Sequence, residues 1–142
     1  MVVVDYLGGV IQRIRAHPPT VAKIGTQIST AKGKSWTAFT HAVLIKRAGS
    51  PPEDYETQRM DAIVDVMLYG PTEYEAYQLW AELHRWLCPD GYTAPNFYRP
   101  GPPGLLFDTV THLAGPMSRT EQETGWPFIY ARYIFKFATV PV

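Results

Sequence analysis

Between residues 56 and 88 the apolar positions change from a spacing of two residues to the spacing of a helix. Apolar and polar side chains alternate over Glu56–Tyr69, which is the pattern of a strand with one buried face. Gly70-Pro71 ends this run. Thr72 and Glu75 then have the spacing of a helix capping box, and an apolar stripe follows at helical spacing. We therefore expect a strand that leads through a tight turn into an amphipathic helix.

The N-terminal part of the chain predicts one helix and two strands. Residues 3–16 have apolar side chains at helical spacing, and the segment His17-Pro18-Pro19 is expected to end that helix. Residues 21–28 are expected to form a short strand. Residues 36–47 predict a longer strand in which Phe39 lies on the same face as core residues, after a turn at 30–34.

The C-terminal part predicts two more strands separated by loops. Residues 89–104 are rich in proline and glycine and are expected to form a long loop without regular structure, and residues 48–54 a shorter one. Alternating apolar runs at 105–115 and 127–140 predict strands, which the polar stretch 118–125 connects.

Together these elements predict an α+β fold. Short, hairpin-like links favour an antiparallel sheet of about four to five strands, with two helices packed on one face. A chain of 142 residues suits one domain, residues 1–142, that includes the Pro-rich loop at 89–104.

Charge changes this picture because it is unevenly distributed along a chain whose net charge is zero. Residues 1–48 contain seven basic residues and one acidic residue, whereas residues 49–90 contain nine acidic and two basic ones. Both sets can be solvated surface. Alternatively, they are complementary flanks of identical subunits that join head to tail in a ring. A net charge of zero does not favour strong binding to nucleic acid.

The sequence has no complete motif for a phosphate-binding loop, a metal site or a catalytic cysteine. The segment Lys32-Gly33-Lys34-Ser35 has Ile28 where a phosphate-binding loop needs a glycine. The four histidines lack the spacing of a metal pair, so we expect no metal and no cofactor. Cys88 is the only cysteine and follows a helix, where a small buried side chain is favoured over a nucleophile beside His84.

Membrane and export signals are also missing from the pattern. No apolar run reaches the roughly 20 residues that span a bilayer. The N-terminus begins apolar and then turns basic, which is the reverse of a signal peptide. A product of the cytoplasm is expected.

Charged and aromatic residues supply candidates for a subunit or partner interface. Asp61 and Asp65 share one strand face, where they form either a solvated or an interface charge row, and Arg132 and Lys136 on another strand can pair with them. The loop aromatics are typical interface anchors, although a loop without a binding role is the alternative. The candidates are Arg13, Arg15, Lys32, Lys34, Lys46, Arg47, Asp61, Asp65, Glu73, Glu82, Tyr92, Phe97, Tyr98, Arg99, Arg132 and Lys136.

One run of the sequence carries a family resemblance. The run Arg59–Gly70 (RMDAIVDVMLYG) leads into Thr72–Tyr77 (TEYEAY) and a helix ending in Leu83–Leu87 (LHRWL). It resembles the central signature of the small tail terminator (tail completion) proteins of long-tailed bacteriophages, in which a strand of the R-x-x-V-D-V kind precedes a T-x-x-E-A helix. The segment Phe128–Val140 is similar to the closing strand of that family.

The resemblance implies a structural virion protein, not an enzyme. Such a protein forms a hexameric ring at the head-proximal end of the phage tail tube, where it ends tube growth and contacts the tail tube protein and the head–tail connector (stopper) protein. It is made in the host cytoplasm, and genome DNA passes through its lumen without sequence-specific binding. If sheet faces line that lumen, Asp61 and Asp65 would repel phosphate. The alternatives are another head–tail connector or minor tail subunit, a small enzyme using Cys88 or a histidine, and a DNA-binding accessory protein.

Overall fold

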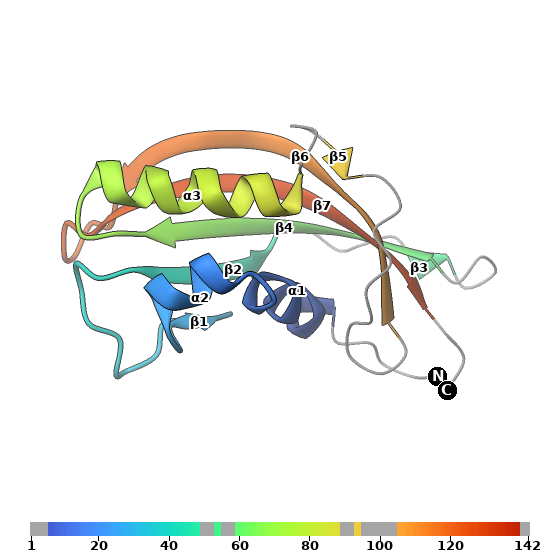
Figure 1. The fold of residues 1–142 in the computed structure, drawn as a ribbon, viewed down its shortest axis with the longest axis horizontal. Coiled ribbons are helices and arrows are strands. Elements are labelled where there is room, and N and C mark those ends of the chain that lie inside the picture. Colours follow the sequence, from blue (N-terminus) through green and yellow to red (C-terminus); the bar gives the residue numbers. More distant parts are fainter. Residues whose placement is uncertain (1–5, 49–52, 55–58, 89–92, 95–104, 140–142) are drawn as a thin grey trace.

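The chain folds into a sheet that carries three helices (Figure 1). The computed structural model describes residues 6–48, 53–54, 59–88, 93–94 and 105–139. The helices are α1 (Tyr6–Arg15), α2 (Pro18–Ile24) and α3 (Glu73–Leu87). The strands are β1 (Ile28–Ser29), β2 (Ala42–Arg47), β3 (Glu53–Asp54), β4 (Arg59–Tyr69), β5 (Thr93–Ala94), β6 (Leu105–Thr120) and β7 (Pro127–Thr139).

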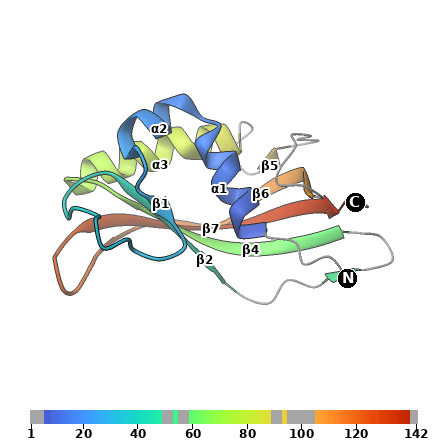
Figure 2. The same cartoon turned by 90° about the horizontal axis from the view of Figure 1, so that it is seen from below.

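Four long strands form the body of the sheet. The strand order is β1-β2-β4-β7-β6-β5, and the two-residue strand β3 pairs with β4. The pairs formed by β2, β4, β7 and β6 are antiparallel, whereas β1 runs parallel to β2, so the sheet is mixed. All three helices lie over the same face, which we call the inner face; the opposite one is the outer face (Figure 2). The α+β class is confirmed. Apart from the two-residue strands β3 and β5, the sheet has five strands, as expected, and three helices cover it instead of two.

The strand–turn–helix unit of β4 and α3 has the predicted structure. A Cβ at Gly70 would lie 2.5 Å from the backbone nitrogen of Ala76, so only glycine lets the turn pack this closely against the helix. The hydroxyl of Thr72 accepts a hydrogen bond from the amide of Glu75 at 3.2 Å, which caps α3. Alternate residues of β4 are fully buried: Ala62, Val64, Val66 and Leu68.

The expected strand at residues 21–28 is wrong, because helix α2 occupies Pro18–Ile24. The two prolines stand in the first turn, where an amide donor is not needed and the fixed φ of proline suits a helix. Thr20 and Ile24, four residues apart, are the buried residues of α2. The prolines that end α1 therefore also begin α2, and only Ile28–Ser29 of the expected strand is extended.

The strand expected at 36–47 begins only at Ala42. Phe39 has a φ of 61°, a left-handed conformation that a strand does not contain. Its side chain is 49% exposed and does not join the core with Val43 and Ile45. The turn expected at 30–34 therefore belongs to a longer loop, which runs from β1 to β2.

Three expected loops are shorter than the sequence indicates. Glu53–Asp54 pairs with β4, and Thr93–Ala94 pairs with β6, so neither loop is wholly irregular. The long strand β6 continues to Thr120 through a cis Gly115-Pro116 bond, instead of ending near residue 115. Gly115 has a φ of 87°, and a Cβ there would lie 2.4 Å from the carbonyl oxygen of Tyr130, so glycine allows the strand to continue.

Candidate assembly surface

Trp86 joins α1 to α3 and buries Arg13. The guanidinium carbon of Arg13 lies 3.9 Å from the centroid of the Trp86 ring, a cation–π contact. The Trp86 indole N–H donates to the Arg13 carbonyl at 3.1 Å, and Arg13 Nη2 donates to the Trp86 carbonyl at 3.4 Å. Arg13 is only 3% exposed. Arg13 was expected to be an interface residue, and this prediction is wrong. Its guanidinium is buried against Trp86 within the subunit.

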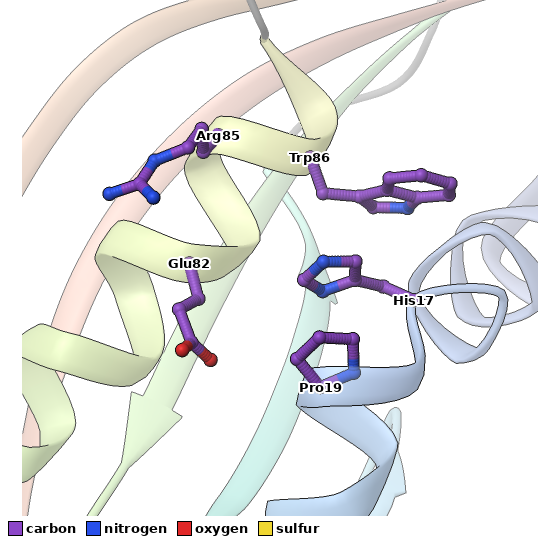
Figure 3. Close-up of a pocket in the computed structure, with 5 residues that line it drawn as sticks. All are labelled: His17, Pro19, Glu82, Arg85 and Trp86. Atoms are coloured by element: carbon purple, nitrogen blue, oxygen red, sulfur yellow. The ribbon is translucent and has the colours of Figure 1, made fainter.

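A pocket of about 270 Å³ lies beside this contact. Figure 3 shows the rings of Trp86, His17 and Pro19 one above another on one side, with Glu82 and Arg85 of α3 on the other. These five residues line the pocket, which we call the aromatic pocket. The volume is below the roughly 300–1,000 Å³ of small-molecule sites, so it suits a single side chain.

Hydrogen bonds and one ion pair fix the walls of the aromatic pocket. His17 Nδ1 lies 2.8 Å from the Thr20 hydroxyl, and its ring stacks on Trp86 with 5.0 Å between centroids. Glu82 forms an ion pair of 3.4 Å with Lys23 of α2. Burial lowers the pKa of His17, against the opposing effect of Glu82. The neutral imidazole is therefore favoured, and the pocket presents ring surface with one acidic and one basic side chain at its edge.

On the outer face, Asp65 is held in a cross-strand cluster. The register pairs Asp65 with Arg132 and Asp61 with Lys136, as expected from the sequence. One carboxylate oxygen of Asp65 accepts from Arg132 Nε at 2.8 Å and from the Tyr130 hydroxyl at 2.6 Å. The charge of Asp65 is consequently offset by Arg132. The side chain of Asp61 lies outside the described part of the structure.

A small apolar cluster fixes the loop between β1 and β2 against the outer face. Trp126 is 1% exposed, and its ring lies 4.4 Å from that of Tyr69. The indole N–H of Trp126 donates to the carbonyl of Thr40 at 3.0 Å. Lys32, from the same loop, forms an ion pair with Glu121 at the β6–β7 turn. Lys32 is thereby bound within the subunit, although it is also an interface candidate.

Gln27 also fixes this loop, at the end that leads into β2. Its side-chain N–H groups donate to the Thr40 hydroxyl at 2.9 Å and to the His41 carbonyl at 2.7 Å. Its side-chain oxygen accepts from the amide of Thr37 at 3.2 Å. The segment around Phe39 is therefore bound on both sides, which holds Phe39 in its left-handed conformation.

Large apolar side chains remain exposed on two elements and on this loop. Tyr74 and Tyr77 of α3 are 70% and 47% exposed, and Phe39 is 49% exposed. Leu113 and Met117 of β6 are also exposed. The sequence reasoning missed Phe39 because alternation placed it inside a strand; only the polar loop residues around it are a signal of the true position.

A polar network lies within the inner core. The Trp80 indole N–H donates to the Tyr133 hydroxyl at 3.1 Å, and that hydroxyl lies 2.9 Å from His84 Nδ1. The Tyr133 hydroxyl therefore lies between the Trp80 indole and the His84 ring and is hydrogen-bonded to both. The ring of His112 lies 4.8 Å from that of His84. His84 is thus a hydrogen-bonded histidine at the boundary of the core.

Cys88 is a buried side chain at the end of α3. It is 1% exposed, and its sulfur lies 3.6 Å from the Val110 carbonyl. Burial raises the pKa of the Cys88 thiol to about 11, so the thiol is protonated near neutral pH. The interpretation of Cys88 as a small buried residue is confirmed.

The remaining interface candidates are either exposed residues of the described structure or residues outside it. Six are exposed and are spread over α1, β2, α3, β7 and the β1–β2 loop: Arg15, Lys34, Lys46, Arg47, Glu73 and Lys136. Four loop candidates lie outside the described residues: Tyr92, Phe97, Tyr98 and Arg99.

Metal-ligand clusters and membrane-spanning helices are both missing from the described residues. In the described ranges, no three His, Cys, Asp or Glu side chains come together as metal ligands. Among the described helices, none has the length and apolar character needed to cross a membrane. No protein-family model matches the chain, and no curated protein shows significant similarity to it.

Proposed function

We propose that this protein is a ring-forming subunit that caps the head-proximal end of a phage tail tube. In this role the ring ends tube growth and joins the tail to the head connector. The protein acts by assembly and not by catalysis. It is made in the host cytoplasm and becomes part of the virion.

The observation that carries the proposal is the unit formed by β4 and α3. The family resemblance is concentrated in Arg59–Leu87, and this run forms a continuous strand, a glycine turn and a capped helix at the centre of the sheet. The resemblance thus rests on one structural unit and not on scattered positions. The long closing strand β7, which pairs with β4 over eleven residues, adds to this support.

The surface is suited to protein contacts. Exposed aromatic side chains such as Tyr74 and Tyr77 are common interface anchors. The described helix α3 contains three glutamates and one arginine, whereas the loop at 30–41 contains two lysines, of which Lys32 pairs with Glu121 and Lys34 is exposed. Opposite charge on separate parts of one subunit supports a head-to-tail arrangement.

The proposed partners are further copies of this chain, most simply six in a ring, together with the tail tube protein and the connector protein. DNA would pass through the lumen without being read. A role for Asp65 in repelling that DNA is not favoured, since Arg132 offsets its charge at 2.8 Å.

The test combines the mass of the purified protein with its effect on tube growth. Native mass spectrometry and electron microscopy should give a ring of six with a central hole, in solution or on the ends of tubes. Added to polymerising tube protein from the same phage, the chain should limit tube length. A closed two-fold dimer, or a chain that leaves tube length unchanged and is absent from tube ends, would contradict the proposal. A ring that binds only the connector would indicate a neighbouring connector subunit instead.

A further inference from the structure

Phe39 is an exposed aromatic residue on a left-handed backbone that its neighbours hold in place. Bulky residues seldom adopt a left-handed backbone, and where they do the surrounding structure holds them there. Here the amide of Thr37 is bound by Gln27, and the carbonyl of Thr40 is bound by Trp126. The strained residue is nevertheless 49% exposed, so its conformation does not serve to bury the ring within its own subunit. An exposed aromatic ring on a backbone that is already ordered loses less entropy on binding than one on a flexible loop.

The same chain has a pocket of suitable size and chemistry for such a ring. The aromatic pocket has a volume of about 270 Å³ and is walled by the rings of Trp86, His17 and Pro19 (Figure 3). Offset or edge-to-face contacts between aromatic rings add to the gain from apolar burial. Burial also keeps His17 toward its neutral form, which favours an apolar guest over a charged one.

Ring and pocket lie on different parts of the subunit. The loop between β1 and β2 is at the end of the molecule where β4 turns into α3 (Figure 1). The pocket is near the other end of α3, beside the start of α2 (Figure 3). A contact between them therefore joins two copies, and in the proposed ring it joins them head to tail.

Charge at the two sites is largely balanced within each subunit. On the loop that carries Phe39, Lys32 pairs with Glu121, whereas Lys34 is exposed. At the pocket, Glu82 pairs with Lys23, and the exposed Arg85 stands beside it. Lys34 can approach Glu82 of the next subunit, but the fit rests mainly on the aromatic rings.

We propose that Phe39 of one subunit inserts into the aromatic pocket of the next subunit, formed by His17, Pro19, Glu82, Arg85 and Trp86. This contact rests on the proposed ring and names its subunit interface. The guest is a second copy of this chain, not a small molecule or a different protein.

Two variants and one control test the contact. Phe39→Ala removes the ring but leaves the pocket, and Arg85→Trp fills the pocket from an exposed position on α3 but leaves Phe39. Tyr74→Ala removes an aromatic ring that is 70% exposed on α3 and is the matched control. Thermal unfolding of each variant checks that the subunit is folded.

Each of the first two variants should raise the concentration needed for assembly more than tenfold, as expected for an interface anchor. Tyr74→Ala should assemble like the wild type. A mixture of Phe39→Ala and Arg85→Trp retains one intact ring and one intact pocket, so native mass spectrometry at high concentration should show a pair containing one of each. Neither variant alone should give a pair.

The proposed function and the contact can fail separately. If the wild type forms rings or limits tube length, and a folded Phe39→Ala or Arg85→Trp does so equally well, the contact is wrong and the ring stands. The absence of a mixed pair at concentrations where the wild type assembles also overturns the contact. If the wild type itself neither forms a ring nor affects tubes, the proposed function fails first.

Discussion

The two faces of the sheet are covered to different extents. The inner face is covered by three helices, and side chains from β2, β4, β6 and β7 meet them in one large core. The outer face has only a small cluster under a loop, formed by Ala42, Leu44, Tyr69 and Trp126. Beyond that cluster it has the Asp65–Arg132 ion pair and half-exposed apolar side chains.

We expect the inner face to determine the stability of the subunit and the outer face to present residues for contact with other subunits. Fully buried apolar area is the largest favourable term in folding, so the inner face should determine the stability of the subunit. Exposed ion pairs contribute little to stability. The outer cluster holds a loop in place, and through that loop it presents Phe39. Substitutions on neighbouring residues of one strand can test the division.

The largest expected effect follows from truncating the inner core. Phe135 of β7 is fully buried, and its replacement by alanine should lower the free energy of unfolding by about 3–5 kcal/mol. The neighbouring Ile134 points to the outer face and is half-exposed, so Ile134→Ala is the matched control with a clearly smaller loss. Urea denaturation measures both. An equal loss for the two variants would contradict the division between faces.

A smaller effect is expected from removing one hydroxyl from each face. Tyr133→Phe leaves the Trp80 indole N–H and His84 Nδ1 without their shared partner in the core, which should cost about 1–3 kcal/mol. Tyr130→Phe removes the hydroxyl that donates to Asp65, but water and Arg132 can replace it. We expect a change within about 0.5 kcal/mol there. Denaturation curves that rank the two variants in the opposite order would refute this account.

The free energy of unfolding at alkaline pH should also depend on the inner core, through the buried thiol of Cys88. Burial raises the pKa of Cys88 to about 11 from the 9.0 of an exposed thiol. As the pH rises through 9, the unfolded chain loses this proton before the folded one, so the folded state binds more protons and the free energy of unfolding falls. The fall should continue until about pH 11. Below pH 9 the thiol makes no contribution to the pH dependence.

Cys88→Ala isolates this contribution. Burial also raises the pKa of Tyr69 to about 12, so tyrosine ionisation adds its own alkaline loss in both proteins. The difference between wild type and variant, measured by urea denaturation from pH 8 to pH 11, should therefore change with pH through the thiol alone. A difference that stays constant over this range would mean that Cys88 is not protected in the folded state.

The sequence predicted the parts of the fold that depend on near neighbours. The alternation of β4, the glycine turn and the Thr72 cap are local patterns, and each is present as expected. The burial of Cys88 and the partner of His84 follow from their place on an apolar helix face. The α+β class follows from the order of these elements.

The missed features depend on contacts between residues far apart in the chain. Arg13 looks like a surface cation until Trp86, 73 residues away, covers its charge. In the sequence Phe39 looks like a strand residue, because its spacing from Val43 is that of two residues on the same buried face of a strand. Its true conformation is set by Gln27 and Trp126, which nothing in the local pattern indicates. The aromatic pocket likewise joins residues of α2 and α3.

The smallest expected effect is a gain in stability at Phe39. A left-handed backbone costs an L-residue roughly 1–2 kcal/mol, and glycine avoids that strain while adding about 0.4–1 kcal/mol of flexibility to the unfolded chain. Both Phe39→Gly and Phe39→Ala lose the ring, but only glycine relieves the backbone at a φ of 61°. We expect Phe39→Gly to exceed Phe39→Ala in stability by up to about 1 kcal/mol, measured by thermal unfolding below the assembly concentration. Both variants should lose assembly equally. A glycine variant less stable than the alanine variant would show that the loop does not hold Phe39 under strain, and would remove the reason for regarding this residue as preformed for contact.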